Sequence, residues 1–451
     1  EDRKHSPSKD EEADWDNRAV DYRTWYEQYS GEAVEELDKS KTPKEGRQPY
    51  KWPLRINPVG IACRLHQQAL VGEIKDPADP VAPAYCEPKD KNSKDDIAVA
   101  AEATEAIRQV EQENGIAALD TECMLLTQVW GGIVQRVVFD GQADFLESGI
   151  RIEYLKPEEC WFRWQGNNYR FPPTDAWLKR TISKEDAARY GVKIDQDGEY
   201  FEHWSAEERH VMIDGKPANH PDTGEPMYGK NPYGLVPFLY TPHTRGGEAW
   251  GESFIPGAVG MIEELNNRMA DTGDSSFLNV HEYPVGWNIQ EGHPVERRLP
   301  DGRPWLNLGR ILGKSPEPHL DFMKRPPVSE AAIKFTEDVL ELLRLQLMTS
   351  EASYGVLQGT QRSGQTVYSL GWLMHSHVNL ERIYWTQSLI ARSEMILKLL
   401  KLYGKHEIGE QHLGLRKRVQ WSPQVPMDRQ ALVNEMTARI SDGTIAPDTG
   451  M

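Results

Sequence analysis

The sequence predicts an α+β protein in which the first half of the chain mixes helices and strands and the second half consists mainly of long helices. Residues 133–139 are rich in valine and isoleucine, and residues 149–155 alternate apolar and polar side chains, as strands do. Residues 253–280 and 328–348 instead repeat apolar side chains every three or four positions, which places them on one face of a helix. Because 38% of the 451 residues are hydrophobic, the chain can form one or more packed cores.

The rest of the first half is predicted from its polar and proline-rich stretches. The first 50 residues are polar and charged, and we expect an irregular arm or a short first helix there. Residues 76–93 contain four prolines and predict a loop, because proline denies hydrogen bonds to helices and sheets. Further strands are expected at 199–204 and 209–213.

Three more helices and two long connections complete the secondary structure that we predict. Residues 94–113 and 117–130 each precede a glycine-containing pair, Asn-Gly and Gly-Gly, that favours the end of a helix. A longer helix is expected at 367–403, ending at a glycine. Residues 281–327 contain many glycines and prolines and predict turns, and residues 349–366 form a loop of mostly small side chains.

The two amphipathic rods carry the residues that we expect to hold subunits together. In the first rod, the residues that share one face are Ile255, Val259, Ile262, Leu265 and Met269. In the second rod, the residues predicted to be buried are Ala332, Phe335, Val339, Leu342 and Leu343. Because these stripes are too long to be covered within one hairpin, neighbouring subunits should bury the remainder. The expected subunit interface consists of Ile255, Val259, Ile262, Leu265, Phe335 and Val339.

Charge and cysteine content exclude several classes of protein. The net charge of −18 argues against a surface that grips DNA phosphates, because that affinity comes from lysine and arginine. An acidic wall would nevertheless let DNA slide past it. No apolar run approaches the roughly 20 residues that cross a bilayer. The four cysteines have no close spacing and predict free thiols in a reducing cytosol: Cys63, Cys86, Cys123 and Cys160.

The sequence predicts no catalytic residue, no cofactor and no metal site. The run Gly-Arg-Ile-Leu-Gly-Lys-Ser at 309–315 resembles a phosphate-binding loop, but three residues instead of four separate its glycines. His375 and His377 lie two residues apart on a predicted helix, so they face different directions and cannot share a metal ion. We expect both to be structural histidines with their hydrogen bonds satisfied.

A carbohydrate-active hydrolase is the alternative class. Several tryptophans lie among abundant acidic residues and could line a sugar-binding cleft that holds a carboxylate pair. These tryptophans are Trp161, Trp164, Trp204 and Trp250. The other interpretation is that they pack inside the protein and at subunit contacts.

A basic triplet, Arg416-Lys417-Arg418, stands out in the acidic chain. One interpretation is a solvated strand edge. The other is that the triplet pairs with acidic groups of a neighbouring subunit or with DNA, in a salt-dependent way.

The order of several short motifs resembles that of portal proteins of long-tailed bacteriophages. Tyr-Gly-Leu-Val-Pro-Phe at 233–238, Gly-Glu-Ser at 251–253 and Ile-Glu-Glu-Leu-Asn-Asn-Arg at 262–268 are similar to the passage from wing to stem in that family. The similarity spans about 95–451. The other motifs that carry it are Trp-Leu-Lys-Arg-Thr at 177–181, Ser-Lys-Glu-Asp at 183–186, Glu-His-Trp at 202–204, Trp-Ser-Pro at 421–423, Val-Pro-Met-Asp at 425–428 and Asp-Gly-Thr-Ile at 442–445.

The resemblance implies a division of the chain into the parts of a portal fold, with an α/β wing, a two-helix stem, a small clip, a long kinked wing helix and a helical crown. The crown of this family usually runs further, so the resemblance implies a truncated one. The implied parts are an N-terminal arm and wing at 1–252, stem helices at 253–280 and 328–348, a clip at 281–327, a tunnel loop at 349–366, a long wing helix and return strand at 367–426, and the start of the crown at 427–451.

The function implied by the resemblance is mechanical rather than enzymatic. Portal subunits form a ring, usually of twelve, at one capsid vertex, through which double-stranded DNA is packaged and ejected. The implied partners are the terminase motor, the major capsid and scaffold proteins, and the head-completion or tail adaptor proteins. The implied locations are the virion and, during assembly, the host cytoplasm. In such a ring we expect the loop 349–366 to reach the channel with Glu351, Tyr354, Gln358, Gln361 and Arg362.

Overall fold

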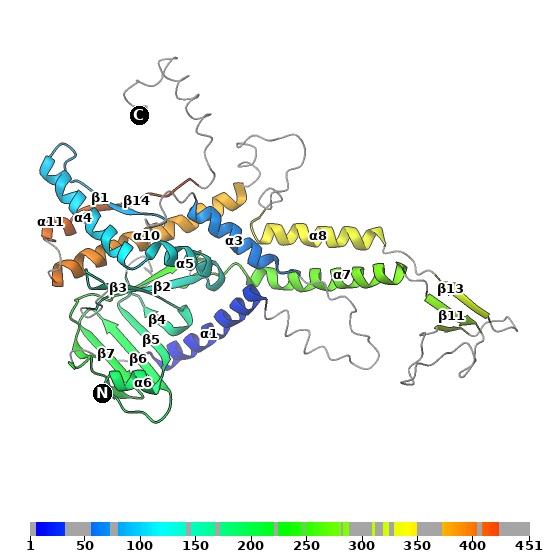
Figure 1. The fold of residues 1–451 in the computed structure, drawn as a ribbon, viewed down its shortest axis with the longest axis horizontal. Helices are drawn as coiled ribbons and strands as arrows, with labels where there is room; N and C mark the ends of the chain where they lie inside the picture. The colour runs from blue at the N-terminus through cyan, green and yellow to red at the C-terminus, as the bar shows by residue number, and fades with distance from the viewer. Residues whose placement is uncertain are drawn as a thin grey trace, which may run out of the picture. The chain divides into compact units, whose positions relative to one another are not determined.

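The computed structural model of the chain has two compact units, and both contain helices and strands (Figure 1). The main unit comprises Glu1–Ser30, Val59–Pro256 and Leu347–Met451, and the hairpin unit comprises Gly31–Pro58 and Gly257–Gln346. The mixture of helix and sheet confirms the predicted α+β class. The structure describes residues 6–31, 56–72, 80–140, 146–166, 172–220, 224–246, 249–280, 283–287, 309–311, 319–323, 329–349, 372–403 and 408–423.

A three-stranded antiparallel sheet lies at the centre of the main unit. Strand β2 (Gly132–Phe139) is its middle strand, between β10 (Phe238–Pro242) and β3 (Ile150–Leu155). All residues of β2 before Phe139 are buried, which explains why its sequence reads as an apolar run instead of an alternation. The edge strand β3 keeps the alternating pattern that the sequence shows.

A larger antiparallel sheet adjoins it and has the strand order β4-β5-β6-β7-β8, with β9 paired to β7. Helix α6 (Lys184–Arg189) follows β5 and begins after Ser183, whose hydroxyl accepts a hydrogen bond from the Asp186 amide. A 3₁₀ turn, η2 (Pro157–Glu159), leads into the first strand. The strands are β4 (Cys160–Arg163), β5 (Asp175–Ile182), β6 (Gly198–Ser205), β7 (Glu208–Ile213), β8 (Lys216–Pro217) and β9 (Tyr228–Lys230).

Helices α4 (Lys94–Glu113) and α5 (Ile116–Trp130) have the bounds that the sequence predicts to within one residue. The Ser93 hydroxyl caps the start of α4 by accepting a hydrogen bond from the Asp96 amide. At its other end, the Asn114 side chain donates to the Ile150 carbonyl at 2.8 Å and accepts from the Ile152 amide at 2.9 Å. Asn114 therefore ends the helix and also joins it to strand β3.

Helix α10 (Trp372–Tyr403) is the longest helix described and contacts β10, β2 and α4. Its predicted start, at 367, lies outside the described residues. In its second half, Met395, Ile396, Leu397, Leu399 and Leu400 are buried in a shared core with α4 and the three-stranded sheet, while Glu394 and Lys398 are exposed. The described part of the main unit ends with α11 (Glu410–Leu413) and β14 (Arg416–Val419).

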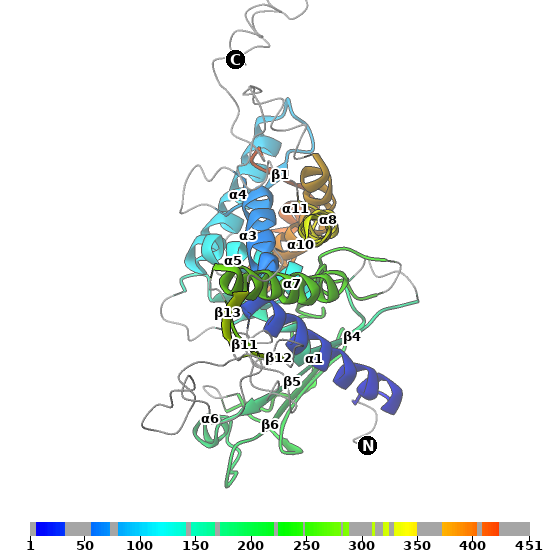
Figure 2. The ribbon, with the colours of Figure 1, turned by 90° about the vertical axis from the view of Figure 1, so that its right-hand side faces the viewer.

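Three elements of the main unit differ from the prediction. Helix α1 (Lys9–Ser30) has 22 residues where we expected an arm or a short helix. It lies against β4 (Figures 1 and 2), where Trp15 stacks on Trp161 and donates to the Glu158 carbonyl at 2.8 Å. Helix α3 (Pro58–Val71) was not predicted. Strand β1 (Ala84–Glu87) interrupts the proline-rich loop, because it pairs with β14 from the far end of the chain.

The hairpin unit contains two antiparallel helices and a small sheet between them in sequence (Figure 1). Helix α7 (Pro256–Val280) leads to the sheet, and α8 (Glu330–Gln346) returns from it. The Arg268 guanidinium of α7 lies 5.0 Å from the centre of the Phe335 ring of α8. In the sheet, β11 (Tyr283–Trp287) pairs parallel with β12 (Gly309–Ile311) and antiparallel with β13 (His319–Met323).

None of the described helices is both long enough and apolar enough to cross a membrane.

A buried guanidinium connects α10 to the rest of the main unit. Arg392 is fully buried, and its Nη1 and Nη2 donate to Asp120 on α5 at 2.8 and 3.1 Å. Its Nε and Nη2 donate to Glu111 on α4 at 3.0 and 2.7 Å, and Nη1 also donates to the Tyr154 hydroxyl on β3 at 3.2 Å. Burial alone would lower the pKa of Arg392, but Asp120 and Glu111 outweigh it and hold that pKa well above its ordinary value.

Replacing Arg392 with methionine should lower the free energy of unfolding by about 3–5 kcal/mol, because two buried carboxylates would lose the one cation that they share among the described residues. Urea denaturation followed by circular dichroism measures this loss. Arg108→Met on α4 is the control, because Arg108 is half-exposed and its ion pair with Glu105 is worth at most about 1 kcal/mol. Equal losses in both variants would contradict the role given to Arg392.

Candidate functional site

The predicted interface residues of the two rods fall into a buried set and an exposed one. Ile255, Ile262, Leu265 and Val339 are buried in the single chain, and Val259 is half-buried. Phe335 is 45% exposed, and Leu342, which was also predicted to be buried, is 55% exposed. The predicted burial of these two side chains is therefore wrong for the single chain; of the predicted α8 residues, only Val339 and Leu343 are buried.

Helix α8 thereby presents an apolar stripe to solvent, consisting of Phe335, Leu342 and Leu345. At 3.6 residues per turn these three side chains lie within about 80° of one another around the helix. Leu345 is 56% exposed, so all three are close to half or more exposed. Exposed apolar surface arranged as a continuous stripe is typical of a surface that another protein covers.

The predicted channel loop lies outside the described residues. This applies to Glu351, Tyr354, Gln358, Gln361 and Arg362, whose role stays a prediction. Of the run that resembles a phosphate-binding loop, residues 309–311 form strand β12, and the remainder also lies outside the described residues.

The tryptophans proposed for a sugar-binding cleft are packed in a core. Trp161, Trp204 and Trp250 are buried and Trp164 is half-buried. The rings of Trp161 and Trp250 have their centres 5.0 Å apart, and those of Trp164 and Trp250 are 5.5 Å apart. Since these faces are occupied by one another, the tryptophans do not form a cleft that a sugar could enter.

One carboxylate, that of Glu202 on β6, contacts a tryptophan of this group, and its charge is neutralised within the sheet. Its Oε2 accepts hydrogen bonds from Arg136 at 2.6 Å and from the Tyr200 hydroxyl at 3.0 Å, and its Oε1 accepts from Trp204 Nε1 at 2.6 Å. Arg136 also binds Glu153 on β3. Burial would raise the pKa values of both carboxyl groups. Arg136 acts together with a second arginine, Arg209 for Glu202 and Arg151 for Glu153, and with the hydrogen bonds that the carboxylates accept, so that both pKa values are lowered.

The basic triplet is engaged within the chain. Lys417 is only 7% exposed, and its Nζ donates to the Leu413 carbonyl at 2.8 Å. Arg418 forms an ion pair with Glu87 at 2.8 Å across the pairing of β14 with β1. The interpretation as a solvated strand edge is therefore wrong for Lys417. Arg416 lies 3.9 Å from the same Glu87, so both arginines have an acidic neighbour within their own chain.

The four cysteines are buried and free, as the spacing predicted. Burial raises the pKa of each thiol, which keeps these side chains protonated and unreactive near neutral pH.

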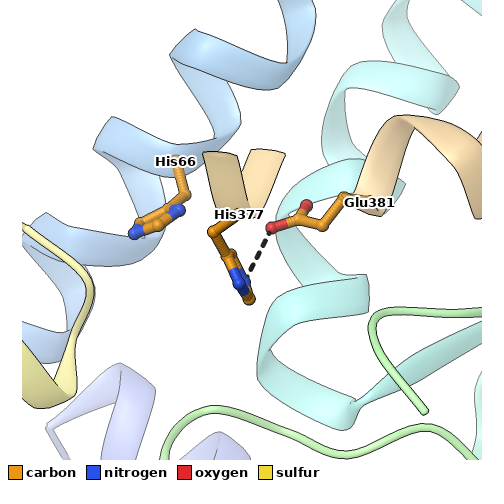
Figure 3. Close-up of side chains that lie close together, drawn as sticks. All are labelled: His66, His377 and Glu381. Carbon is orange, nitrogen blue, oxygen red and sulfur yellow. Dashed lines mark ion pairs between the residues drawn. The ribbon is translucent and has the colours of Figure 1, made fainter. Parts of the chain in front are cut away.

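The two histidines of α10 lie on different sides of the helix, as predicted, but His377 has contacts that were not predicted. His377 contributes to a buried group of three ligand-type side chains with His66 and Glu381, and His375 is not among them, as expected from their spacing (Figure 3). However, His377 is not simply a satisfied structural residue, because its Nε2 lies 3.0 Å from Nε2 of His243. We call His66, His243, His377 and Glu381 the histidine cluster.

The sequence contains one indication of this cluster. His377 and Glu381 are four residues apart and therefore share a helix face. His66 on α3 and His243 after β10 could not be connected to them without the fold, since long stretches of chain separate them.

No known protein-family model and no curated protein sequence matches this chain, so its function is inferred from its own residues.

Replacing Glu202 with glutamine should lower the free energy of unfolding at pH 7 by about 3 kcal/mol, because the buried Arg136 would keep only the partly exposed Glu153 as an ion-pair partner among the described residues. Because the folded-state pKa of Glu202 lies below its unfolded value, its contribution is complete above about pH 4.5 and is lost as pH falls through the folded value. The variant should therefore lose less stability than the native chain between pH 5 and pH 3.

Chemical denaturation across this pH range measures both effects. Glu199→Gln, on the same strand, is the control, because Glu199 is half-exposed and pairs only with Lys179 at the surface. An acid dependence unchanged by Glu202→Gln would show that Glu202 does not titrate as described.

Proposed function

We propose that this chain is a subunit of a bacteriophage portal ring, which forms at one capsid vertex and through which double-stranded DNA is packaged and ejected. The observation that carries the proposal is the hairpin unit, in which two long antiparallel helices join a small sheet to a larger α+β unit. Its segment from Gly257 to Gln346 falls within 253–348, the span that resembles the stem and clip of portal proteins.

The exposed side chains of α8 support assembly into a ring. Phe335, Leu342 and Leu345 would be costly to leave in water at about 25 cal/mol per Å² of apolar surface. The main unit has two buried cores of its own, and it also leaves Trp372, Leu380 and Ile383 of α10 exposed. A closed ring lets every copy cover the same stripe of its neighbour, which is how head-to-tail contacts avoid open-ended growth.

The electrostatics suit a conduit rather than a DNA clamp. At −18 per chain, a ring of about twelve chains would repel phosphates overall, so contact with DNA would be local and transient. In this proposal the loop 349–366 supplies that contact, and the clip side of the hairpin unit docks the terminase motor and later the head-completion or tail adaptor proteins. The capsid and scaffold proteins surround the ring.

The proposed role is not enzymatic, and the hydrolase alternative loses its basis. Three of the four tryptophans on which that alternative rested are buried, and Glu202 beside them is paired with Arg136. Neither the aromatic surface nor a free carboxylate pair remains at that place among the described residues.

Purified chain should form rings of high symmetry, and Leu342→Asp should reduce their yield at least several-fold, because a charge in the buried stripe would be unpaired. Native mass spectrometry and negative-stain electron microscopy measure this. Ile97→Asp on α4 is the control, since Ile97 is similarly exposed but lies in the main unit. A native chain that remains monomeric or dimeric at micromolar concentration would contradict the proposal.

Replacing Tyr354, Gln358, Gln361 and Arg362 together with alanine should leave rings intact while reducing the DNA content of assembled particles. The rods that hold subunits together are unchanged in this variant, so only contact with the passing DNA is affected. Ring mass and packaged genome length are the two measurements. Rings that package a full genome would exclude the loop as the DNA contact.

A further inference from the structure

The histidine cluster lies inside the main unit, at the meeting of three segments that are distant in sequence. His66 comes from α3, His243 follows β10, and His377 and Glu381 are one turn apart on α10. Each of the four residues is less than a tenth exposed. Figure 3 shows the carboxylate of Glu381 directed toward the ring of His377, both from α10, with the ring of His66 from α3 on the other side of His377.

Three atoms of the cluster are spaced like ligands of a single metal ion. Nε2 of His377 lies 3.0 Å from Nε2 of His243 and 3.3 Å from Oε1 of Glu381, and Nε2 of His243 lies 3.1 Å from the same oxygen. Ligand atoms at 2.0–2.1 Å from a tetrahedral zinc ion are roughly 3.3–3.4 Å apart. The three atoms therefore need to separate by only a few tenths of an ångström to surround an ion.

The hydrogen bond that His243 makes away from the cluster leaves a lone pair on its other ring nitrogen, which faces the cluster. Nδ1 of His243 lies 3.0 Å from the Glu252 carbonyl, which can only accept, so Nδ1 carries a proton. In the neutral imidazole, Nε2 then has an unused lone pair that faces the carboxylate of Glu381. Bonds of this kind from the far nitrogen to a carbonyl orient metal-binding histidines.

His66 offers the fourth ligand. Its Nε2 lies 3.0 Å from the Leu347 carbonyl and donates to it, which leaves Nδ1 with a lone pair. Nδ1 of His66 and Oε2 of Glu381 are buried and have no hydrogen-bond partner among the described residues. One ring nitrogen of His66 lies within 4.8 Å of the ligand atoms of His377 and Glu381, so a small movement of this side chain completes the set.

Without a cation, the cluster would leave several acceptors facing one another. One Nε2–H from His377 can satisfy either His243 or Glu381 fully, but not both at once. Unmet buried acceptors cost about 1–3 kcal/mol each. Either an additional proton on the imidazoles or a metal ion resolves this conflict, and only the metal also uses the lone pair of His66.

We propose that His66, His243, His377 and Glu381 bind one divalent transition-metal ion, with Zn²⁺ preferred. Three imidazoles and a carboxylate are ligands that suit zinc, and four protein ligands make a closed, structural site. The ion would fix α3 and the segment after β10 to helix α10. This inference does not depend on the proposed portal function.

The test uses the full chain, freed of metal with EDTA and then titrated with Zn²⁺ alone. We expect one zinc per chain by mass spectrometry of the metal content, and a rise of several degrees in melting temperature with zinc in excess. Co²⁺ in place of zinc should give the intense visible absorption of a tetrahedral site. A chain that binds no stoichiometric zinc and melts at the same temperature would overturn the proposal in favour of a shared buried proton.

His243→Gln and Glu381→Gln should each weaken zinc binding by at least about 100-fold, since each removes a direct ligand. His412→Gln is the matched control, because His412 is equally buried and faces a single carboxylate, Glu102, at 3.3 Å. If the first two variants fail to fold, His66→Gln provides the test, because the only hydrogen bond that it loses among the described residues is that to the Leu347 carbonyl. Unchanged zinc affinity in the cluster variants would also overturn the proposal.

Discussion

The guanidinium of Arg392 is the interaction on which the arrangement of the main unit depends. It is buried, it carries a charge that cannot be left without partners, and its partners come from two helices and a strand: Glu111, Asp120 and Tyr154. Because a buried charge is tolerated only with its hydrogen bonds satisfied, α10 has one register in which it can pack against α4, α5 and β3. Apolar contacts alone would allow the helix to slide or rotate at lower cost.

The same helix carries polar groups along its whole buried length. Ser388 accepts hydrogen bonds from Gln135 of β2 at 3.0 Å and from Thr241 of β10 at 2.6 Å, one turn before Arg392. Glu381 lies two turns earlier, where it meets His243 and His377. Once Arg392 sets the register, these groups also reach their partners. A helix with polar links on its inner side is more specific in position than a purely apolar one, which suits a scaffold that must hold other elements in place.

Each unit covers only part of its apolar surface within one chain. In the main unit, tryptophans and aliphatic residues from α1, both sheets and α10 cover one another in two buried cores, while Trp372, Leu380 and Ile383 of α10 stay exposed. The hairpin unit leaves Phe335, Leu342 and Leu345 close to half or more exposed on α8. Under the proposed function, the stem-like helices would cover their exposed apolar side chains by contact with neighbouring copies. The cost of exposed stripes would make the isolated chain prone to associate.

Local pattern alone determined much of the secondary structure. The periodicity of α4, α5, α7 and α8 and the patterns of β2, β3, β6 and β7 were all readable, since a helix or strand face repeats within a few residues. Local pattern also indicated that His375 and His377 face different sides of one helix. The exposed stripe of α8 was only partly foreseen, because amphipathicity identifies an apolar face but not whether the chain itself covers it.

Tertiary structure decided what depends on partners far away in the chain. The polar sequence of α1 forms a long helix because Trp15 stacks on Trp161. Strand β1 forms in a proline-rich segment because β14 pairs with it. The histidine cluster and the environment of Arg392 arise in the same way, from residues whose proximity no spacing encodes. Hydrogen bonds and ion pairs across such distances depend on the packing of the whole unit, so they cannot be derived from the order of residues alone.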